Sequence, residues 1–161
     1  MRQVNIKQLF TYRLNVLANM SSRIAALRNK REFGLSMLDW RMIALLASYA
    51  PLSLNRLAQE ANLDKGRVSR AIADLIARGL IKRSVDEKDG RGIKLKLSVK
   101  GKSVYRRVLP HAVQRNDDLT AALTSVEKRT LEQIISKLTT RGLEMFTAER
   151  KLAKAAPVKF R

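Results

Sequence analysis

Apolar residues recur at helical spacing over most of the chain. Between residues 4 and 30 they lie three and four apart, which predicts one long amphipathic helix that Gly34 ends. A second helix follows, and either Ser36 or Asp39 can cap its N-terminus. The N-terminal third of the chain is therefore expected to be helical.

The C-terminal part shows the same helical pattern. A long helix is expected from about 102 to 122 after a turn at Gly101, and Pro110 should kink it or remove one backbone hydrogen bond. A last helix opens at Ser125 and runs to about residue 150. One small domain cannot bury the apolar stripes of three such long helices, so we expect them to join two copies of the chain in a homodimer.

The middle of the chain has shorter elements. Two short helices are predicted at 53–61 and 64–79, joined by a turn of a few residues. An extended segment follows, and after a charged, glycine-containing tip at 86–92 the residues from 93 to 100 alternate strictly between apolar and polar, which predicts a two-stranded hairpin. Two strands alone are marginally stable, so this hairpin must pack on the helices. The fold class is mainly α (α+β), with a winged helix-turn-helix between long terminal helices.

The net charge of the chain indicates what kind of partner it binds. The chain has 33 Lys and Arg against 14 Asp and Glu, a formal net charge of +19. The excess is +9 over residues 51–107, against +6 over 1–50 and +4 over 108–161. A net charge this large destabilises a compact chain by self-repulsion unless a partner relieves it. Because the densest positive charge coincides with the helix-turn-helix, we expect double-stranded DNA as the partner.

Composition excludes several classes of function. The chain has no Cys, so disulfides, thiolate metal sites, a cysteine nucleophile and thiol redox sensing are excluded. It has one His, no phosphate-binding glycine loop and no carboxylate pair in an apolar context. We therefore expect that the protein is not an enzyme and binds no metal or other cofactor. No apolar run suits a membrane span and no signal peptide is evident. We therefore expect a cytoplasmic protein without a membrane partner, associated with the nucleoid when it is bound to DNA.

The first turns of the helix at 64–79 are expected to enter the major groove. They carry Lys65, Gly66, Arg67, Ser69 and Arg70. An arginine here either pairs with guanine O6 and N7 or contacts phosphate alone, and the lysine favours phosphate. The glycine, which costs about 1 kcal/mol in a helix relative to Ala, either permits close approach to DNA or is a tolerated first-turn residue.

Further candidate contacts flank this helix. Ser53 begins the preceding helix, where it can cap the backbone and also contribute to a phosphate site. Lys88 and Arg91 occupy the hairpin tip, where an arginine suits the narrow, negative minor groove. The alternative for the tip is a solvated turn.

The hairpin resembles the wing of the MarR family of bacterial transcription regulators. Residues 89–98 read Asp-Gly-Arg-Gly-Ile-Lys-Leu-Lys-Leu-Ser, and the family wing has an Asp, an Arg two residues later and alternating aliphatic residues that end in Leu-Thr or Leu-Ser. The resemblance extends over roughly residues 5–150 through shorter pieces, which are Gly34-Leu35-Ser36 before Trp40, Leu57-Ala58, Val68-Ser69-Arg70, Gly79-Leu80 and Gly101. Gly90 and Gly92 replace bulkier or basic residues of the family wing, which predicts a more mobile tip. The run 65–67 replaces small hydroxyl residues, so the family's base preference does not transfer.

The resemblance implies both an assembly and a mechanism. Asp89 corresponds to the residue that fixes the wing arginine, and Arg91 to the arginine that enters the minor groove. The first and last helices are implied to form a homodimer, whose two winged helices would read a pseudo-palindromic operator with half-sites about 10 base pairs apart. The mechanism usual in the family is repression of a promoter, released by a small, often aromatic and anionic, effector.

The division that follows is an N-terminal dimerisation helix at 1–35, a winged helix-turn-helix at 36–100, C-terminal dimerisation helices at 101–150 and a basic tail at 151–161. An effector is possible rather than required. The residues able to stack on or pair with an aromatic acid near the junction of the first, second and fifth helices are Tyr12, Arg13, Trp40, Arg41 and His111. For the tryptophan, core packing is the alternative, and for the histidine a structural role.

Two functions stay open. One is a sequence-specific transcriptional regulator, and the other is a sequence-neutral architectural DNA-binding protein, which the charge alone would support. An RNA-binding role is disfavoured, because the chain lacks aromatic stacking platforms.

Overall fold

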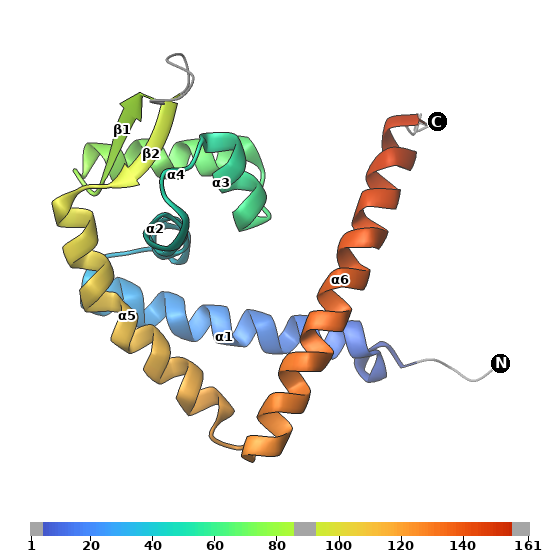
Figure 1. The fold of residues 1–161 in the computed structure, drawn as a ribbon. Coiled ribbons are helices and arrows are strands. Elements are labelled where there is room, and N and C mark those ends of the chain that lie inside the picture. The colour runs from blue at the N-terminus through green and yellow to red at the C-terminus, as the bar shows by residue number, and fades with distance from the viewer. Residues whose placement is uncertain (1–4, 86–92, 156–161) are drawn as a thin grey trace. The chain divides into compact units, whose positions relative to one another are not determined.

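The computed structural model describes residues 5–85 and 93–155, and it divides into two compact units, Met1–Arg115 and Asn116–Arg161 (Figure 1). Each unit is described by itself. The elements in chain order are η1 (Ile6–Gln8), α1 (Phe10–Phe33), α2 (Met37–Tyr49), α3 (Leu54–Ala61), α4 (Lys65–Ala77), β1 (Ile81–Val85), β2 (Ile93–Leu97), α5 (Val99–Thr120) and α6 (Ser125–Ala155). The fold is thus mainly helical with one small sheet, as the sequence predicted.

The first helix is shorter at its N-terminus than the apolar spacing predicts. Asn5 caps a single 3-10 turn, η1, by accepting a hydrogen bond from the Lys7 amide at 3.0 Å. Leu9 then has an extended backbone, so the helical hydrogen-bond ladder begins only at Phe10. The predicted start at residue 4 is therefore wrong, whereas the predicted stop is confirmed by Gly34, whose φ of 62° ends α1 in a left-handed conformation.

The choice between two caps for α2 is settled by reciprocal hydrogen bonds. The Ser36 Oγ accepts from the Asp39 amide at 3.0 Å, and the Asp39 Oδ2 accepts from the Ser36 amide at 2.9 Å. Ser36 is the N-cap and Asp39 completes a capping box, so both residues take part.

The two strands form the predicted antiparallel hairpin. Ile81 pairs with Leu97 and Lys82 with Lys96, and the register continues to Val85 opposite Ile93. Leu52, just before α3, adds a short bridge to β2 through two backbone hydrogen bonds with Leu95, of 3.2 and 2.8 Å. The tip of the hairpin lies outside the described residues.

Gly101 lies inside α5 and not in a turn before it, which corrects the sequence interpretation. Ser98 caps the helix by accepting from the Gly101 amide at 2.9 Å. A Cβ on Gly101 would collide with the carbonyl oxygen of Leu80, so the glycine serves the close packing of α5 against the start of β1. The helix continues past Pro110 to Thr120.

The core of the first unit lies between α2, α3, α4, the hairpin and the start of α5. Its fully buried side chains include Met42, Ile43, Leu57, Leu75 and Val108. This burial holds the helix-turn-helix against the sheet, so the orientation of α4 is set by apolar packing.

The second unit consists largely of α6. Thr124 and Glu127 form a capping box at its start, in which the Glu127 Oε2 accepts from the Thr124 amide at 2.8 Å. The hydrogen bonds that the Glu127 carboxylate accepts from the Thr124 amide and hydroxyl lower the pKa of Glu127. No α6 residue whose exposure is described is buried. Among the described residues, no helix is both long enough and apolar enough to cross a membrane.

Candidate nucleic-acid interface

Helix α4 places one face in the core and the other in solvent. Its buried residues are Val68, Ala71, Ile72 and Leu75. The residues predicted to contact DNA, which are Lys65, Gly66, Arg67, Ser69 and Arg70, are all exposed. The apolar periodicity alone produces this division, because residues three and four apart share a face of a helix.

The positive charge of this face is not neutralised within the described part of the chain. Lys65, Arg67 and Arg70 have no carboxylate oxygen within salt-bridge distance there, although Asp64 accepts from the Arg67 amide at 3.0 Å to cap the helix. By contrast, Arg56 on α3 is paired with Glu60 at 2.7 Å. With no carboxylate partner among the described residues, these cations of α4 are available to phosphates or base edges.

Gly66 lies under the end of the Arg70 side chain. A Cβ on Gly66 would lie 3.8 Å from the Arg70 Nη1 and 3.1 Å from the Asp64 Oδ1, which is a tight contact with the helix cap. The glycine thus leaves room for both the cap and the arginine, and its closeness to DNA stays a prediction.

Ser53 is the N-cap of α3, as predicted. Its Oγ accepts from the Arg56 amide at 3.2 Å, and the residue is half-buried. Its contribution to a phosphate site stays a prediction. Lys88, Asp89 and Arg91 lie outside the described residues.

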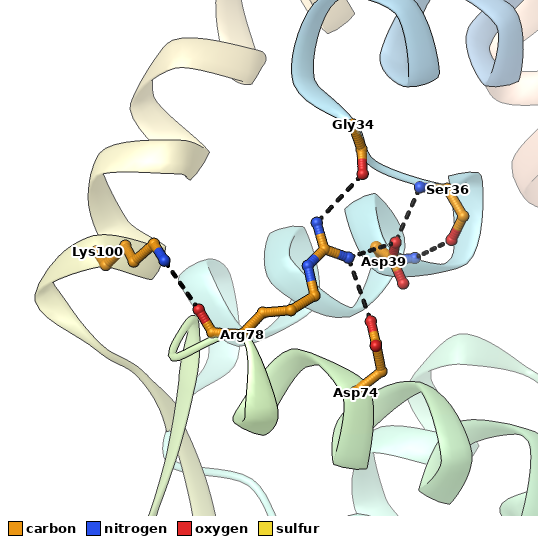
Figure 2. A network of polar contacts seen from close by, with 6 residues as sticks. All are labelled: Gly34, Ser36, Asp39, Asp74, Arg78 and Lys100. Carbon is orange, nitrogen blue, oxygen red and sulfur yellow. Dashed lines mark hydrogen bonds and ion pairs between the residues drawn. The ribbon is translucent and has the colours of Figure 1, made fainter.

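A polar network fixes the C-terminal end of α4, and the sequence interpretation missed it (Figure 2). The Arg78 guanidinium, next to the end of α4, donates through Nη1 to Asp39 Oδ2 and Asp74 Oδ2, both at 3.2 Å, and through Nη2 to the Gly34 carbonyl oxygen at 3.2 Å. On its other side, the Lys100 Nζ donates to the Arg78 carbonyl oxygen at 3.0 Å. The Arg78 side chain therefore joins the end of α4 to the α1–α2 turn, and the Arg78 carbonyl joins the same end to α5.

Only the Asp74–Arg78 part of this network was detectable in the sequence, as an i,i+4 pair on one helix. Asp39 reaches Arg78 from a distance of 39 residues along the chain, and its side chain is only 12% exposed. The network makes the angle of α4 depend on the turn between α1 and α2.

The five predicted effector residues do not come together within one chain. Tyr12 and Arg13 lie in the first turn of α1, whereas His111 packs against Glu32 and Phe33 in its last turn. Twenty residues of helix separate these two ends, a distance of about 30 Å at 1.5 Å per residue. Arg41 is exposed on α2.

Trp40 takes the core position that was its alternative interpretation. It is 9% exposed and belongs to the apolar cluster of the first unit. Its ring stacks on Tyr105 with centroids 5.8 Å apart and planes 15° from parallel.

His111 lies in a cluster of charged residues that join α1 to α5. Its Nδ1 is 3.2 Å from the Glu32 Oε2, and its ring meets Phe33 edge-on at 5.0 Å. A hydrogen bond from Arg31 holds the pKa of Glu32 below its usual value, and the charges of Arg31 and His111 lower it further.

Arg115 belongs to the same cluster. Burial lowers the pKa of its guanidinium, and the neighbouring charge of Arg28 adds to this effect. The Arg115 Nη1 is buried and has no hydrogen-bond partner among the described residues. Buried donors in proteins are usually hydrogen-bonded, so an acceptor placed at this nitrogen would be stabilised.

The geometry agrees with comparisons to known proteins. A family model described as MarR family matches residues 33–92. A solved structure of a MarR/EmrR family transcriptional regulator from Acinetobacter sp. ADP1 is similar with a TM-score of 0.81 and 26% identity, over 88% of this chain and 99% of that chain. No curated protein matches the sequence.

Two further structures share the fold at lower identity. The S. aureus MepR–DNA complex has a TM-score of 0.77 and 16% identity, over 85% of this chain and 99% of that chain. The PcaV transcriptional regulator from Streptomyces coelicolor, in complex with its natural ligand, has a TM-score of 0.69 and 20% identity, over 87% and 98%.

Proposed function

Because the chain belongs to the MarR family of transcription regulators, we propose that it is a repressor that binds duplex DNA through α4 and is released by a small anionic effector. Proteins of this family are transcription regulators and not enzymes, in agreement with the composition. The observation that carries the DNA-binding part is the exposed face of α4, on which Lys65, Arg67 and Arg70 have no carboxylate partner in the described structure.

Both ends of the proposed DNA-contacting helix α4 are held in place. Asp64 caps α4 and Arg78 anchors its other end, so the cations are held by a rigid helix. Arg70 is the best candidate for reading a base and Lys65 for contacting phosphate. One structure of the same fold, MepR of S. aureus, is a complex with DNA.

A homodimer is supported by apolar side chains that remain exposed in each unit. On α1 they include Phe10, Leu14, Leu17, Met20 and Ile24, each at least 45% exposed. On α6 they include Ile134, Ile135, Leu143, Met145 and Phe146, each at least 47% exposed. Apolar stripes of this length normally mark an interface. Two copies related by a two-fold axis would read a pseudo-palindromic operator.

The experiment that tests DNA recognition compares two affinities at physiological salt. We expect the protein to bind the DNA upstream of its own gene about 10³-fold more tightly than random DNA in a mobility-shift assay. A ratio near one would instead establish the architectural alternative, in which phosphate contacts alone supply the affinity.

The effector part rests on the cluster around His111. Among the described residues the buried Arg115 Nη1 has no acceptor. Arg115 and His111 could together hold an effector carboxylate, which would compete with Glu32 for the histidine. Among proteins of the same fold, PcaV is known with its natural ligand, and the DNA binding of BpsR from Bordetella bronchiseptica is regulated by 6-hydroxynicotinic acid.

A panel of small aromatic acids, added to the mobility-shift assay, tests the effector. We expect at least one acid to weaken operator binding, and Arg115→Gln to abolish that response while leaving operator binding without acid intact. The effector part of the proposal fails if no acid weakens binding or if Arg115→Gln responds as the parent protein does.

A further inference from the structure

A groove in the first unit is separate from both sites described above. It lies between the C-terminal end of α2, one face of the hairpin and the start of α5, and its volume is about 970 Å³. That volume is at the upper end of the range typical of small-molecule sites, about 300–1,000 Å³. None of the residues assigned to DNA or effector binding lines it.

One wall of the groove is a cluster of like charges. Lys82 of β1 faces Lys96 of β2 in the register, and Ser84 faces Lys94 beside them. These four residues share one face of the hairpin, because side chains two apart in a strand point the same way. Lysines directly opposite each other repel, so an anion that bridges them would be stabilising.

Helix α5 adds two cations from another side. Lys102 and Arg106 lie one turn apart at its start, and both line the groove. The described lining residues thus include five cations and no carboxylate. Because the cations come from two separate elements, they suit an anion with more than one acidic group.

The remaining wall is apolar. It is formed by Leu46, Ala47, Ala50 and Pro51 at the end of α2, and by Leu97 and Val99. Tyr105 also lines the groove, and its ring is held in place by stacking on Trp40. A flat apolar group could pack between this ring and the small side chains of α2.

From this combination we propose that the groove binds a small molecule with an apolar ring and at least two acidic groups. The concave shape and the apolar wall favour a small ligand over the DNA backbone, which would require charge but no apolar wall. Binding at this groove does not depend on whether the protein is a repressor.

Fluorescence of the only tryptophan of the chain can report ligand binding in the groove. Trp40 stacks on Tyr105, so a ligand that packs on Tyr105 should change the fluorescence of Trp40. The probes are benzoate, phthalate and benzene-1,3,5-tricarboxylate at constant ionic strength. We expect affinity to rise about tenfold from benzoate to the di- or tricarboxylate, since a further charged hydrogen bond forms. Equal affinity for the three acids would overturn the proposal.

Paired variants locate the binding. Lys96→Gln with Lys102→Gln should weaken tricarboxylate binding by about tenfold or more, whereas Lys128→Gln with Lys137→Gln on α6 should leave it unchanged. Equal losses in the two double variants would show a general charge effect and overturn the site.

A steric pair tests the position independently of charge. Ala47 is exposed and lines the groove, so Ala47→Phe should block the ligand, whereas the neighbouring Ser48, which is exposed but does not line the groove, should tolerate Ser48→Phe. Binding that survives Ala47→Phe in a folded protein would overturn the proposal. The proposal would also be overturned if Lys96→Gln still bound the tricarboxylate but no longer bound DNA. The groove would then be part of the DNA-binding surface.

Discussion

Gly101 shows how one missing side chain allows two elements to approach. A Cβ there would meet the Leu80 carbonyl oxygen and press on Leu97. Gly101→Ala should therefore lower the free energy of unfolding by about 1–3 kcal/mol, measured by urea denaturation, because the overpacked contact must open.

Gly142 is the matched control for this substitution. It lies within α6 with no atom within 4 Å of its added Cβ. Gly142→Ala should leave stability unchanged or raise it by about 0.5–1 kcal/mol, since the helix gains a better helix former. If both alanines have the same effect, close packing is not the reason for Gly101.

Arg70 is the residue of α4 that we expect to recognise a base of the operator. It is exposed on α4 and, in the described structure, lacks a carboxylate partner. Arg70→Ala should cost about 1–3 kcal/mol of operator binding and relax the preference at one position in each half-site, measured by binding to a set of operator variants. Arg129→Ala on α6 should change affinity little. A loss that is uniform over all sequences would assign Arg70 to phosphate.

At the scale of elements, the orientation of α4 depends on a network that joins three helices. Arg78 pairs with Asp39 at 3.2 Å and also holds the Gly34 carbonyl oxygen, so α4 is tied to the start of α2. The Asp39 side chain is 12% exposed, whereas that of Asp74 is 59% exposed. The partly buried pair should therefore contribute more to stability than the exposed one.

A double-mutant cycle tests this difference. Unfolding of Arg78→Ala, Asp39→Ala and the double variant should give a coupling energy of about 1 kcal/mol, whereas the same cycle with Asp74 should give about 0.5 kcal/mol or less. The cycle separates the ion pair from the helix cap that Asp39→Ala also removes. Equal coupling for the two aspartates would mean that burial does not strengthen the Asp39 pair.

At the scale of the whole molecule, the exposed apolar stripe of α6 is part of the proposed dimer interface. Ile135 is 50% exposed and lies on this stripe, whereas Thr140 lies on the opposite side of the helix. Ile135→Lys should shift the protein from dimer to monomer in sedimentation experiments and weaken operator binding, because a buried lysine in an apolar interface is costly.

The control places the same side chain on the other face. Thr140→Lys should leave the sedimentation coefficient and operator affinity near those of the parent protein. If Ile135→Lys also remains dimeric, the α6 stripe is not the interface.

The sequence by itself determined the elements and the face that α4 offers to solvent. Apolar spacing predicted six helices and a hairpin, and Ser53 and Gly34 marked ends that the structure confirms. These features depend on residues within a few positions of each other, so local periodicity and capping are sufficient to predict them. The start of α1 was the exception, because the extended backbone of Leu9 interrupts an otherwise continuous apolar pattern.

Only the tertiary structure decided which distant residues meet. It brought Asp39 to Arg78, packed Gly101 against Leu80, and separated Tyr12 from His111. It also gathered lysines of the hairpin and cations of α5 around one groove. Such contacts depend on how the helices and the sheet pack, and residues that are far apart in the chain carry no local signal of that packing.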